Sequence, residues 1–485
     1  MARTTVPDVK IRFADQELEE GSGGRYDHLH PFEGTLLSTF PLAGKEEVDL
    51  AVKAAKEASD GWRRWAPEAR RDVLLRLADL IEEHRTEFAE LAVLDCGTPF
   101  GPAQYIVDMA LAWTRYYAGW ADKISGELIS TPDTRGALAY TMPQPIGVVG
   151  VIITWNGPML SLGMKVPAAL AAGNCVVVKP SEFTPYAADL YARLAREAGL
   201  PDGVLAMLPG AREAGDALVR HEDVELISFT GGPDAARHIL AACADQMKPA
   251  VLELGGKSAN IVFPDVEDLE DVLQRAVAGV IGTVSGQGCA CPTRLVVHDD
   301  IFDEVVERVT AIAEGYRMGD PWDAETTVGP VINQGAADRI AAMLARAQQD
   351  GAGRITTGGG LAGGALAGKP FVEPTIVADP DPDSEISQVE IFGPVLLVNR
   401  FSDEEDAIAF ANRTQYGLAT YIETRDSQRI HRMAEQIRSS NVAVNGAYVL
   451  GPHMPYGGQG VSGYGKEGGR AGLDEYLRYK TVIVG

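Results

Sequence analysis

The stretch IGVVGVII at residues 146–153, followed by NCVVVKP at 174–180, decides the fold. Both are short apolar runs, and two more of the same kind follow, ELISFTG at 225–231 and AVLELGG at 250–256. Helix-like stretches such as AADLYARLAREAGL at 187–200 separate them. Continuous apolar runs joined by helical crossovers are typical of buried parallel strands, so we expect an α/β fold with a parallel sheet.

Outward from this sheet the chain has a helical region and a second mixed region. Residues 46–120 show helical periodicity, with Leu74 and Leu77 recurring on one face, and predict a set of packed helices. A further strand-and-helix stretch covers residues 260–450. Within it, the glycine-rich segment 351–369 is expected to be a flexible surface loop.

The C-terminal stretch DEYLRYKTVIVG, residues 474–485, ends in a strand-like apolar run. We expect this strand to have no partner of its own, which leaves an exposed edge. Pairing with another subunit would cover that edge, so a homodimer or homotetramer is predicted.

Composition narrows the class of protein. With 485 residues, of which 46% are hydrophobic, the sequence predicts a globular protein of two or three packed units. The formal net charge of −25 argues against a nucleic-acid partner, because phosphate is held by clustered Lys and Arg. The five cysteines form no paired framework, and no apolar run approaches the roughly 20 residues that span a bilayer. We expect a cytoplasmic protein without a membrane partner or a metal.

An open parallel sheet binds ligands beyond the carboxyl ends of its strands, where helix N-termini present N–H groups to phosphate. Residues 179–182 and 230–233 follow two of the expected strands. We therefore expect a phosphate-bearing ligand at these positions.

Candidate catalytic residues come from three separate motifs. Cys289, in TVSGQGCACPTR, follows small residues that let a ligand approach, although a lone Cys is more often a buried structural thiol. Glu253, in LELGGKS, can act on water as a general base or can be an ordinary solvated charge. Asn156, in PIGVVGVIITWNGP, can donate to an oxyanion or can simply form a turn. The three together, in this order along the chain, favour catalysis over the separate alternatives.

From roughly residue 25 to the C-terminus the sequence resembles the aldehyde dehydrogenase superfamily, of the NAD-dependent, hydrolytic kind. One motif of this sort is weak evidence, whereas seven in family order make chance a poor explanation. The motifs are PIGVVGVIITWNGP at 145–158, KPSE at 179–182, FTGG at 229–232, LELGGK at 252–257, GQGC at 286–289, EIFGPV at 390–395, and PYGG followed by SGYGKEGG near the C-terminus.

The resemblance implies an aldehyde dehydrogenase-like fold. Such a fold has a Rossmann-type cofactor domain, an α/β catalytic domain and a small oligomerisation segment of strands. The implied boundaries are residues 1–122 and 146–254 for NAD binding, 255–450 for catalysis, and 123–145 with 451–485 for oligomerisation and bridging.

The resemblance also implies the reaction, which is oxidation of an aldehyde to a carboxylic acid with NAD through a Cys289 thiohemiacetal and thioester. Glu253 is then the base, and Asn156 forms the oxyanion hole with the Cys289 backbone N–H. Lys165 and Glu467 match positions that pass protons away from the base, and an ordinary exposed charge is the competing interpretation of each.

NAD is the cofactor that the resemblance implies. Lys179 and Glu182 match residues that hold the adenosine ribose, and the Glu182 carboxylate favours NAD because it would repel a 2′-phosphate. Thr230 and Gly232 match the pyrophosphate site at a helix N-terminus. Glu390 and Phe392 match the nicotinamide ribose and ring, and the remaining positions assigned to the cofactor are Ile152, Trp155, Gly210 and Leu254.

The sequence departs from the family pattern at several positions. Gly157 replaces the usual aromatic residue, Val284 replaces the usual Asn, and the late PFGG-x-K pattern reads PYGGQG, with Gly460 for Lys. The interval of 36 residues from base to nucleophile is about two longer than expected of the family. Residues 263–275 look able to absorb an insertion, so these departures bear on loop geometry and remove no catalytic group.

Gly157 leads to an expectation about the substrate. Its missing side chain, with Gly288 and Ala290 beside the thiol, predicts a wide pocket for an aromatic or branched apolar aldehyde. The alternative is that Gly157 only permits the turn before Pro158 and that another side chain fills the gap.

Two other functions stay open. A CoA-acylating dehydrogenase would pass the acyl group to CoA rather than to water, and a non-catalytic scaffold would keep the fold without the activity. Glu253 and its relay partners favour water. Retention of Cys289, Glu253 and Asn156 together speaks against a scaffold.

Overall fold

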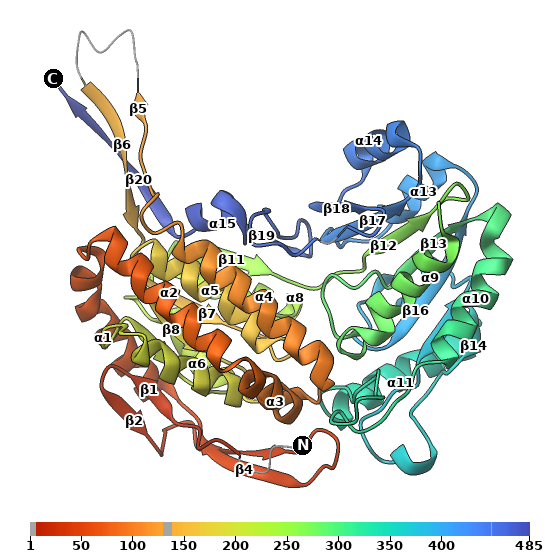
Figure 1. Cartoon of the computed structure of the whole chain (residues 1–485), viewed down its shortest axis with the longest axis horizontal. Coiled ribbons are helices and arrows are strands. Elements are labelled where there is room, and N and C mark those ends of the chain that lie inside the picture. Colours follow the sequence, from red (N-terminus) through yellow and green to blue (C-terminus); the bar gives the residue numbers. More distant parts are fainter. Residues whose placement is uncertain (1–5, 130–137, 448) are drawn as a thin grey trace.

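The computed structural model describes residues 6–129, 138–447 and 449–485. Figure 1 shows two lobes side by side, with a long arm of strands that projects from the first lobe and contains the C-terminus. The first lobe is coloured mainly red to yellow and the second mainly green to blue. The chain has the α/β fold class expected from the sequence.

An eight-stranded sheet in the order β19-β11-β10-β7-β8-β9-β1-β2 organises the first lobe. The four apolar runs form the neighbouring strands β11, β10, β7 and β8, which pair in parallel and are almost wholly buried, as predicted. The strands are β1 (Ile11–Phe13), β2 (Gln16–Leu18), β7 (Val148–Ile152), β8 (Cys175–Lys179), β9 (Leu205–Met207), β10 (Leu226–Thr230), β11 (Ala250–Glu253) and β19 (Gly463–Tyr464).

The register of this sheet brings the carboxyl ends of its parallel strands together. Ile152 lies opposite Lys179 in β8 and opposite Phe229 in β10. Thr230 in turn lies opposite Glu253. The residues that follow these strands therefore meet along one edge of the sheet, where ligands of open α/β sheets bind.

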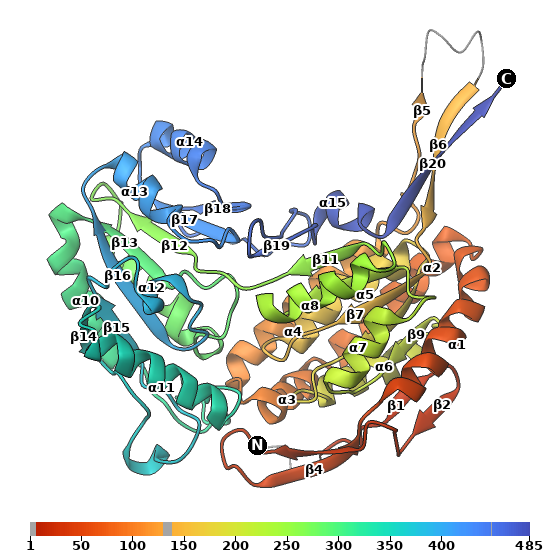
Figure 2. The ribbon, with the colours of Figure 1, turned by 180° about the vertical axis from the view of Figure 1, so that it is seen from behind.

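Helices cover both faces of the sheet, with α5 and α6 on one face and α1, α7 and α8 on the other (Figures 1 and 2). The helical segment predicted over 46–120 is confirmed as four helices. No helix in the described part of the chain is long and apolar enough to cross a bilayer. The helices are α1 (Lys45–Arg63), α2 (Pro67–Glu83), α3 (Arg85–Cys96), α4 (Phe100–Ala118), α5 (Pro158–Ala171), α6 (Tyr186–Glu197), α7 (Arg212–Arg220), α8 (Pro233–Ala244) and α15 (Gly469–Asp474).

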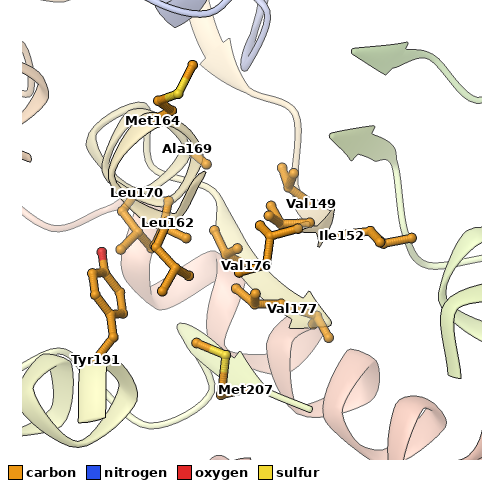
Figure 3. Close-up of a cluster of buried hydrophobic side chains, with 14 of the residues drawn as sticks. Val149, Ile152, Leu162, Met164, Ala169, Leu170, Val176, Val177, Tyr191 and Met207 are labelled. Carbon is orange, nitrogen blue, oxygen red and sulfur yellow. The ribbon is translucent and has the colours of Figure 1, made fainter. Parts of the chain in front are cut away.

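Helix α5 is apolar around most of its circumference, as is typical of a helix buried between two layers. Figure 3 shows Leu162 and Leu170 of α5 on the side of Val176 in β8, and all three side chains are fully buried. At Gly163 an added Cβ would lie 2.8 Å from the Ala110 Cα, so glycine is what allows α4 to approach. Burial of each such aliphatic side chain contributes about 1.5–3 kcal/mol, which fixes α5 firmly behind the site.

The second lobe contains a seven-stranded sheet in the order β14-β15-β16-β13-β12-β17-β18, in agreement with the predicted strand-and-helix region. Its strands are β12 (Ala259–Val262), β13 (Arg294–His298), β14 (Arg354–Thr357), β15 (Thr375–Ala378), β16 (Val395–Phe401), β17 (Ala419–Glu423) and β18 (Asn441–Val444). Its helices are α9 (Leu269–Val277), α10 (Phe302–Glu314), α11 (Gln334–Gln349), α12 (Glu385–Gln388), α13 (Glu404–Ala411) and α14 (Ser427–Gln436).

The prediction of a flexible loop over 351–369 is wrong in part. Strand β14 lies within this segment and pairs antiparallel with β15 at the edge of the second sheet. Ile355 of this strand packs against a cluster of buried residues below the sheet. The run Ile-Thr-Thr consists of β-branched residues that favour a strand, and the surrounding glycines concealed it.

The arm is an antiparallel sheet in the order β20-β6-β5, formed by β5 (Leu128–Ile129), β6 (Leu138–Pro145) and β20 (Leu477–Val484). The expectation that the C-terminal strand has no partner in its own chain is wrong, because β20 pairs with β6 along its whole length. The other edge of β20 has no neighbouring strand within the described ranges. A separate hairpin of β3 (Arg25–Leu29) and β4 (Leu36–Pro41) lies below the first lobe in Figure 1.

Candidate functional site

Cys289 lies in a sharply turning loop between α9 and β13. Three successive residues before it, Val284, Ser285 and Gly286, have left-handed φ angles of 40°, 54° and 75°. At Gly286 an added Cβ would lie 1.9 Å from the Gly393 carbonyl oxygen, so this position accepts only glycine. The loop is therefore held against the segment that follows α12.

Val284, one of the departures from the family pattern, occupies a strained position in this loop. A β-branched residue is a rare occupant of the left-handed region, whereas Asn adopts it with less strain. Strain of this kind is of order 1–3 kcal/mol and persists only where neighbouring contacts impose it. Two such contacts are the bond from the Ser285 hydroxyl to the Gly329 carbonyl at 2.8 Å and the bond from the Ile332 N–H to Gln287 Oε1 at 2.8 Å.

The Cys289 thiol borders a cavity, and its Sγ lies 3.5 Å from the hydroxyl oxygen of Tyr456. Burial raises the pKa of this thiol to about 11, and the hydrogen bond with Tyr456 opposes the rise. The nearby carboxyl groups of Glu390 and Glu253 raise the pKa further. The resting sulfur is therefore a neutral thiol at neutral pH and needs a base before it can act as a nucleophile.

Asn156 lies in the turn between β7 and α5. Its side-chain Nδ2 donates a hydrogen bond to the Gln287 carbonyl oxygen at 2.6 Å. A carboxamide nitrogen carries two N–H groups, so one of them fixes the side chain beside the Cys289 loop and the second is available to a ligand oxygen.

Glu253 ends β11 and is 4% exposed. Neither of its carboxylate oxygens has a hydrogen-bond partner among the described residues. Burial and the neighbouring Glu467 raise the pKa of Glu253 well above its usual value, while Lys165 opposes the rise. A buried carboxylate without a partner is costly to keep, and its place between two cavities makes it a candidate for function.

Lys165 and Glu467, predicted as relay residues, form a buried ion pair, so the competing interpretation of two exposed charges is wrong. Lys165 Nζ lies 2.5 Å from Glu467 Oε1, and both side chains are 1% exposed. Lys165 Nζ also donates to the Ser228 hydroxyl at 3.0 Å, and the Tyr476 hydroxyl donates to the same oxygen at 3.2 Å. Sequence reasoning missed Ser228 and Tyr476, because nothing in their local sequence indicates that they meet this pair.

Two cavities meet at Cys289. One, of about 360 Å³, lies along the carboxyl edge of the first sheet, and the other, of about 280 Å³, lies beside α4 and α5. The thiol is therefore reachable from two sides. The residues that border both cavities are Thr154, Asn156, Thr230, Glu253 and Cys289.

Most of the positions assigned to the cofactor border the larger cavity. Glu182 and Gly210 are not in its wall, but Glu182 lies next to it and accepts a hydrogen bond from Lys179 Nζ at 3.3 Å. Gly210 precedes α7. The assigned positions that do border the cavity are Ile152, Trp155, Lys179, Thr230, Gly232, Leu254, Glu390 and Phe392.

The chemistry of this wall fits a dinucleotide. Helix α8 begins at Pro233, and its N-cap residue Gly232 provides no side-chain cap, so the N–H groups of the first turn after Pro233 are available to phosphate. Glu390 Oε1 accepts from the Gly256 N–H at 3.0 Å, and burial raises the pKa of Glu390 to about 7. The Trp155 and Phe392 rings meet edge to face at 5.4 Å between centroids. Phosphate donors, a carboxyl group for ribose hydroxyls and flat rings are thus present together.

Tyr456 is the residue nearest the candidate chemistry that sequence reasoning did not identify. It is buried, borders the smaller cavity and contacts the Cys289 sulfur. The available signal was the Tyr of PYGG in place of the Phe in the family pattern PFGG.

Comparisons with known proteins agree with one another. The chain matches the Aldehyde dehydrogenase family over residues 18–482. Aldehyde dehydrogenase 1 of Tanacetum cinerariifolium is 40% identical over 488 residues, which cover 98% of this chain and 94% of that protein. The solved NAD⁺ complex of aldehyde dehydrogenase from Bacillus cereus is 35% identical with a TM-score of 0.94, covering 99% of this chain and 96% of that one. PnpE in complex with nicotinamide adenine dinucleotide is 38% identical with a TM-score of 0.95, covering 99% and 98%.

Proposed function

The chain belongs to the aldehyde dehydrogenase family, and from that premise we propose which aldehyde it oxidises and which residues carry the reaction. It is an NAD-dependent aldehyde dehydrogenase. We propose that it oxidises a bulky hydrophobic aldehyde to the carboxylic acid through a thioester on Cys289. The observation that carries this proposal is the meeting of two cavities at Cys289, one that fits a dinucleotide and one lined largely by apolar side chains.

Cys289 supplies the nucleophile. Its S–H proton leaves to the Glu253 carboxylate through water, a bond forms between Sγ and the aldehyde carbon, and the carbonyl π electrons move to oxygen. The second N–H of Asn156 and the Cys289 backbone N–H stabilise the resulting oxyanion. When bound, NAD supplies the hydride acceptor for this carbon. The carbonyl then re-forms and leaves a thioester on Cys289.

Glu253 acts again when the thioester is cleaved. Its two oxygens have no partner among the described residues, so both are available to accept a hydrogen bond from water. Glu253 removes a proton from the attacking water, and the water oxygen forms a bond with the acyl carbon. The C–S bond then breaks, its electron pair returns to the sulfur, and the acid is released. The buried Lys165–Glu467 pair, which interacts electrostatically with Glu253, receives the proton on its way out.

This arrangement supports water rather than CoA as the acyl acceptor. A buried base and a buried relay pair serve proton removal from water, and water depends on them more than a thiol acceptor does, because a thiol loses its proton far more readily than water. Burial of the unpartnered Glu253 carboxylate destabilises the folded protein. A scaffold without activity gains nothing from such a carboxylate beside the Cys289 thiol.

The assignment of functions to segments is likewise a proposal. We assign NAD binding to residues 1–122 and 146–254, catalysis to 255–450, and oligomerisation and bridging to 123–145 and 451–485. The first sheet, the second sheet and the arm support these three assignments. Strand β19 is an exception, because it adds an antiparallel edge to the first sheet.

We propose a homodimer or homotetramer in which the arm lies at the subunit contact. Its exposed apolar side chains Leu128, Leu138, Met142, Ile483 and Val484 are 37% to 74% exposed, and the outer edge of β20 can accept another strand. We expect light scattering to give the mass of a dimer or tetramer. Ile483→Glu should shift that mass downward, whereas Met247→Glu, at a 90% exposed site on the first lobe, should not. A stable monomer of the unmodified chain would contradict the proposal.

The first catalytic prediction concerns the two cysteines of the loop. Cys289→Ala should lower kcat by several orders of magnitude, because covalent capture divides one difficult step into two easier ones. Cys291→Ala should keep most of the activity, since its buried thiol is not at the junction of the cavities. NADH formation from an aldehyde, measured for both variants, checks this. An active Cys289→Ala enzyme would show that the nucleophile is elsewhere.

The second catalytic prediction concerns Glu253→Gln, which should slow thioester hydrolysis more than hydride transfer and leave a burst of NADH in the first turnover. In the unmodified enzyme the raised pKa of Glu253 means that this carboxyl group ionises only at a higher pH than an ordinary carboxyl group. The turnover rate should therefore fall as the pH drops through the raised pKa of Glu253. The Gln variant should lose this pH dependence. Rapid-mixing kinetics across pH test both statements. Absence of a burst would mean that Glu253 acts mainly in activating Cys289.

The proposed substrate class depends on the smaller cavity. An added Cβ at Gly157 would meet only the Leu160 Cβ, at 3.9 Å, so no other side chain closes this gap near the backbone. At Gly288 close packing, and not substrate space, accounts for the glycine, since a Cβ there would lie 2.6 Å from the Cys291 sulfur. Apolar side chains in the wall include Ile106, Met109, Leu160, Met164, Val449 and Leu450, and Asn260, Arg275 and Glu423 add a polar section.

We therefore expect aromatic or branched aldehydes to exceed acetaldehyde in kcat/KM. Each additional buried methylene contributes about 0.8 kcal/mol, or roughly fourfold in kcat/KM. Gly157→Phe should reverse the order by filling the cavity, with Gly157→Ala as a control of intermediate size. A panel of aldehydes assayed by NADH formation tests this. Equal or better use of acetaldehyde by the unmodified enzyme would show that the cavity does not select for bulk.

A further inference from the structure

The Tyr456 hydroxyl is a polar group placed at the nucleophile where the family pattern has the plain ring of Phe. Its oxygen lies 3.5 Å from Cys289 Sγ, within hydrogen-bond distance for sulfur. The Tyr456 side chain is 2% exposed and borders the smaller cavity. A hydroxyl at this depth is costly to bury unless it bonds to something, and the sulfur is its partner.

The backbone around Tyr456 fixes the position of that hydroxyl. The Tyr456 N–H donates to the Glu467 carbonyl at 2.7 Å, and the Glu467 N–H donates back to the Tyr456 carbonyl at 2.7 Å. The next residue, Gly457, has its carbonyl bonded by Asn441 Nδ2 at 3.2 Å, and an added Cβ there would lie 2.7 Å from Glu253 Oε1. These contacts fix the Tyr456 ring to the backbone segment that also carries Glu467, one of the proposed relay residues. The same segment lies next to the proposed base Glu253.

We propose that Tyr456 is a further catalytic residue, whose hydroxyl donates a hydrogen bond to the Cys289 sulfur as the thiolate forms and directs it toward the aldehyde cavity. The inference rests on the proposed function of Cys289 as the nucleophile. It extends that function, because hydrogen bonds to a charged acceptor are roughly twice as strong as neutral ones.

The other groups that face Cys289 leave this role to Tyr456. Glu253 and Glu390 disfavour a negative sulfur, and Cys291 is a buried neutral thiol. The Tyr421 hydroxyl donates to the Ala290 carbonyl at 3.0 Å. Two groups favour the thiolate, namely the Tyr456 hydroxyl and the Ala290 backbone N–H. Burial raises the pKa of Tyr456 well above its usual value, so its hydroxyl keeps its proton and acts as a donor.

A single proton moves when the Cys289 thiolate forms. The S–H proton leaves Cys289 for Glu253, and the tyrosine proton stays on its own oxygen throughout. When the bond between Sγ and the aldehyde carbon forms, the sulfur loses its charge and the hydrogen bond from Tyr456 weakens. The same donor is in place when the thioester breaks and the electron pair returns to the sulfur.

Tyr456→Phe removes the hydroxyl and keeps the ring. The reporter is the rate of alkylation of Cys289 by iodoacetamide without NAD or aldehyde, measured by mass spectrometry of the Cys289 peptide at several pH values between about 7 and 10, all below the thiol pKa of about 11. Loss of the bond to a charged acceptor should lower the thiolate fraction about tenfold at each pH. The alkylation rate should therefore fall about threefold to tenfold, because the higher nucleophilicity of the more basic thiolate offsets part of this loss. kcat/KM should fall in parallel, without a change in NAD affinity or melting temperature.

Tyr191→Phe is the matched control. Tyr191 is a fully buried core tyrosine, visible in Figure 3, whose hydroxyl has no partner among the described residues. It should leave the alkylation profile and kcat/KM unchanged.

Two outcomes would overturn the inference. One is an unchanged alkylation rate in Tyr456→Phe with unchanged kcat/KM. The other is an unchanged alkylation rate with lower kcat/KM, because the hydroxyl would then act on the aldehyde and not on the thiol. Failure of the proposed function itself is distinguishable, because Cys289→Ala would then stay active whatever Tyr456→Phe does.

Discussion

Burial of the ionisable groups at the junction of the two cavities is the condition on which the rest of the site depends. Burial raises the pKa values of Cys289, Glu253, Glu467 and Tyr456, so each resists the charged form at rest. A charge that forms in such surroundings is stabilised only by groups already in position, and fixed N–H and O–H donors act far more strongly there than in water. This explains why, in the proposed mechanism, the turn amide of Asn156 and backbone N–H groups stabilise the developing charge rather than mobile surface cations.

The C-terminal segment connects this junction to the rest of the molecule. After β18 the chain passes from the second lobe back over the first and continues into the arm, as the blue ribbon in Figure 1 shows. On this path it supplies Tyr456 and Glu467 to the site, and β19 pairs with β11, where Gly463 lies opposite Glu253. The arm begins ten residues after Glu467, at Leu477 of β20. The proposed subunit contact at the arm therefore lies on the same continuous segment as Glu467, the proposed relay residue.

Local sequence patterns identified most elements of the fold but not all of their partners. The apolar runs and the helical periodicity of residues 46–120 identified strands and helices because burial of each depends on its own residues. The partner of β20 was not foreseen, since β6 lies more than 300 residues earlier and its sequence, LAYTMPQP, contains two prolines and no regular alternation of apolar and polar residues. In the same way, the family motifs pointed to Cys289, Glu253 and Asn156. The Tyr of PYGG marked position 456 as a departure, but its contact with Cys289 spans 167 positions and could not be read from that motif.

Three of the departures from the family pattern lie on the proposed aldehyde side of Cys289. Gly157, Val284 and Tyr456 all border the smaller cavity, whereas most positions assigned to NAD border the larger one. The same cofactor binds in every turnover, so the residues that line the larger cavity have little freedom to vary. The residues that line the smaller cavity contact the aldehyde and can differ from one substrate to another. Gly157 stands where the family more often has an aromatic ring, and it leaves open space in the largely apolar wall of this cavity. A small aldehyde would leave part of the 280 Å³ to water, which competes with Asn156 and Tyr456 for the developing charges. A bulky apolar aldehyde displaces that water and so completes the environment in which these donors act.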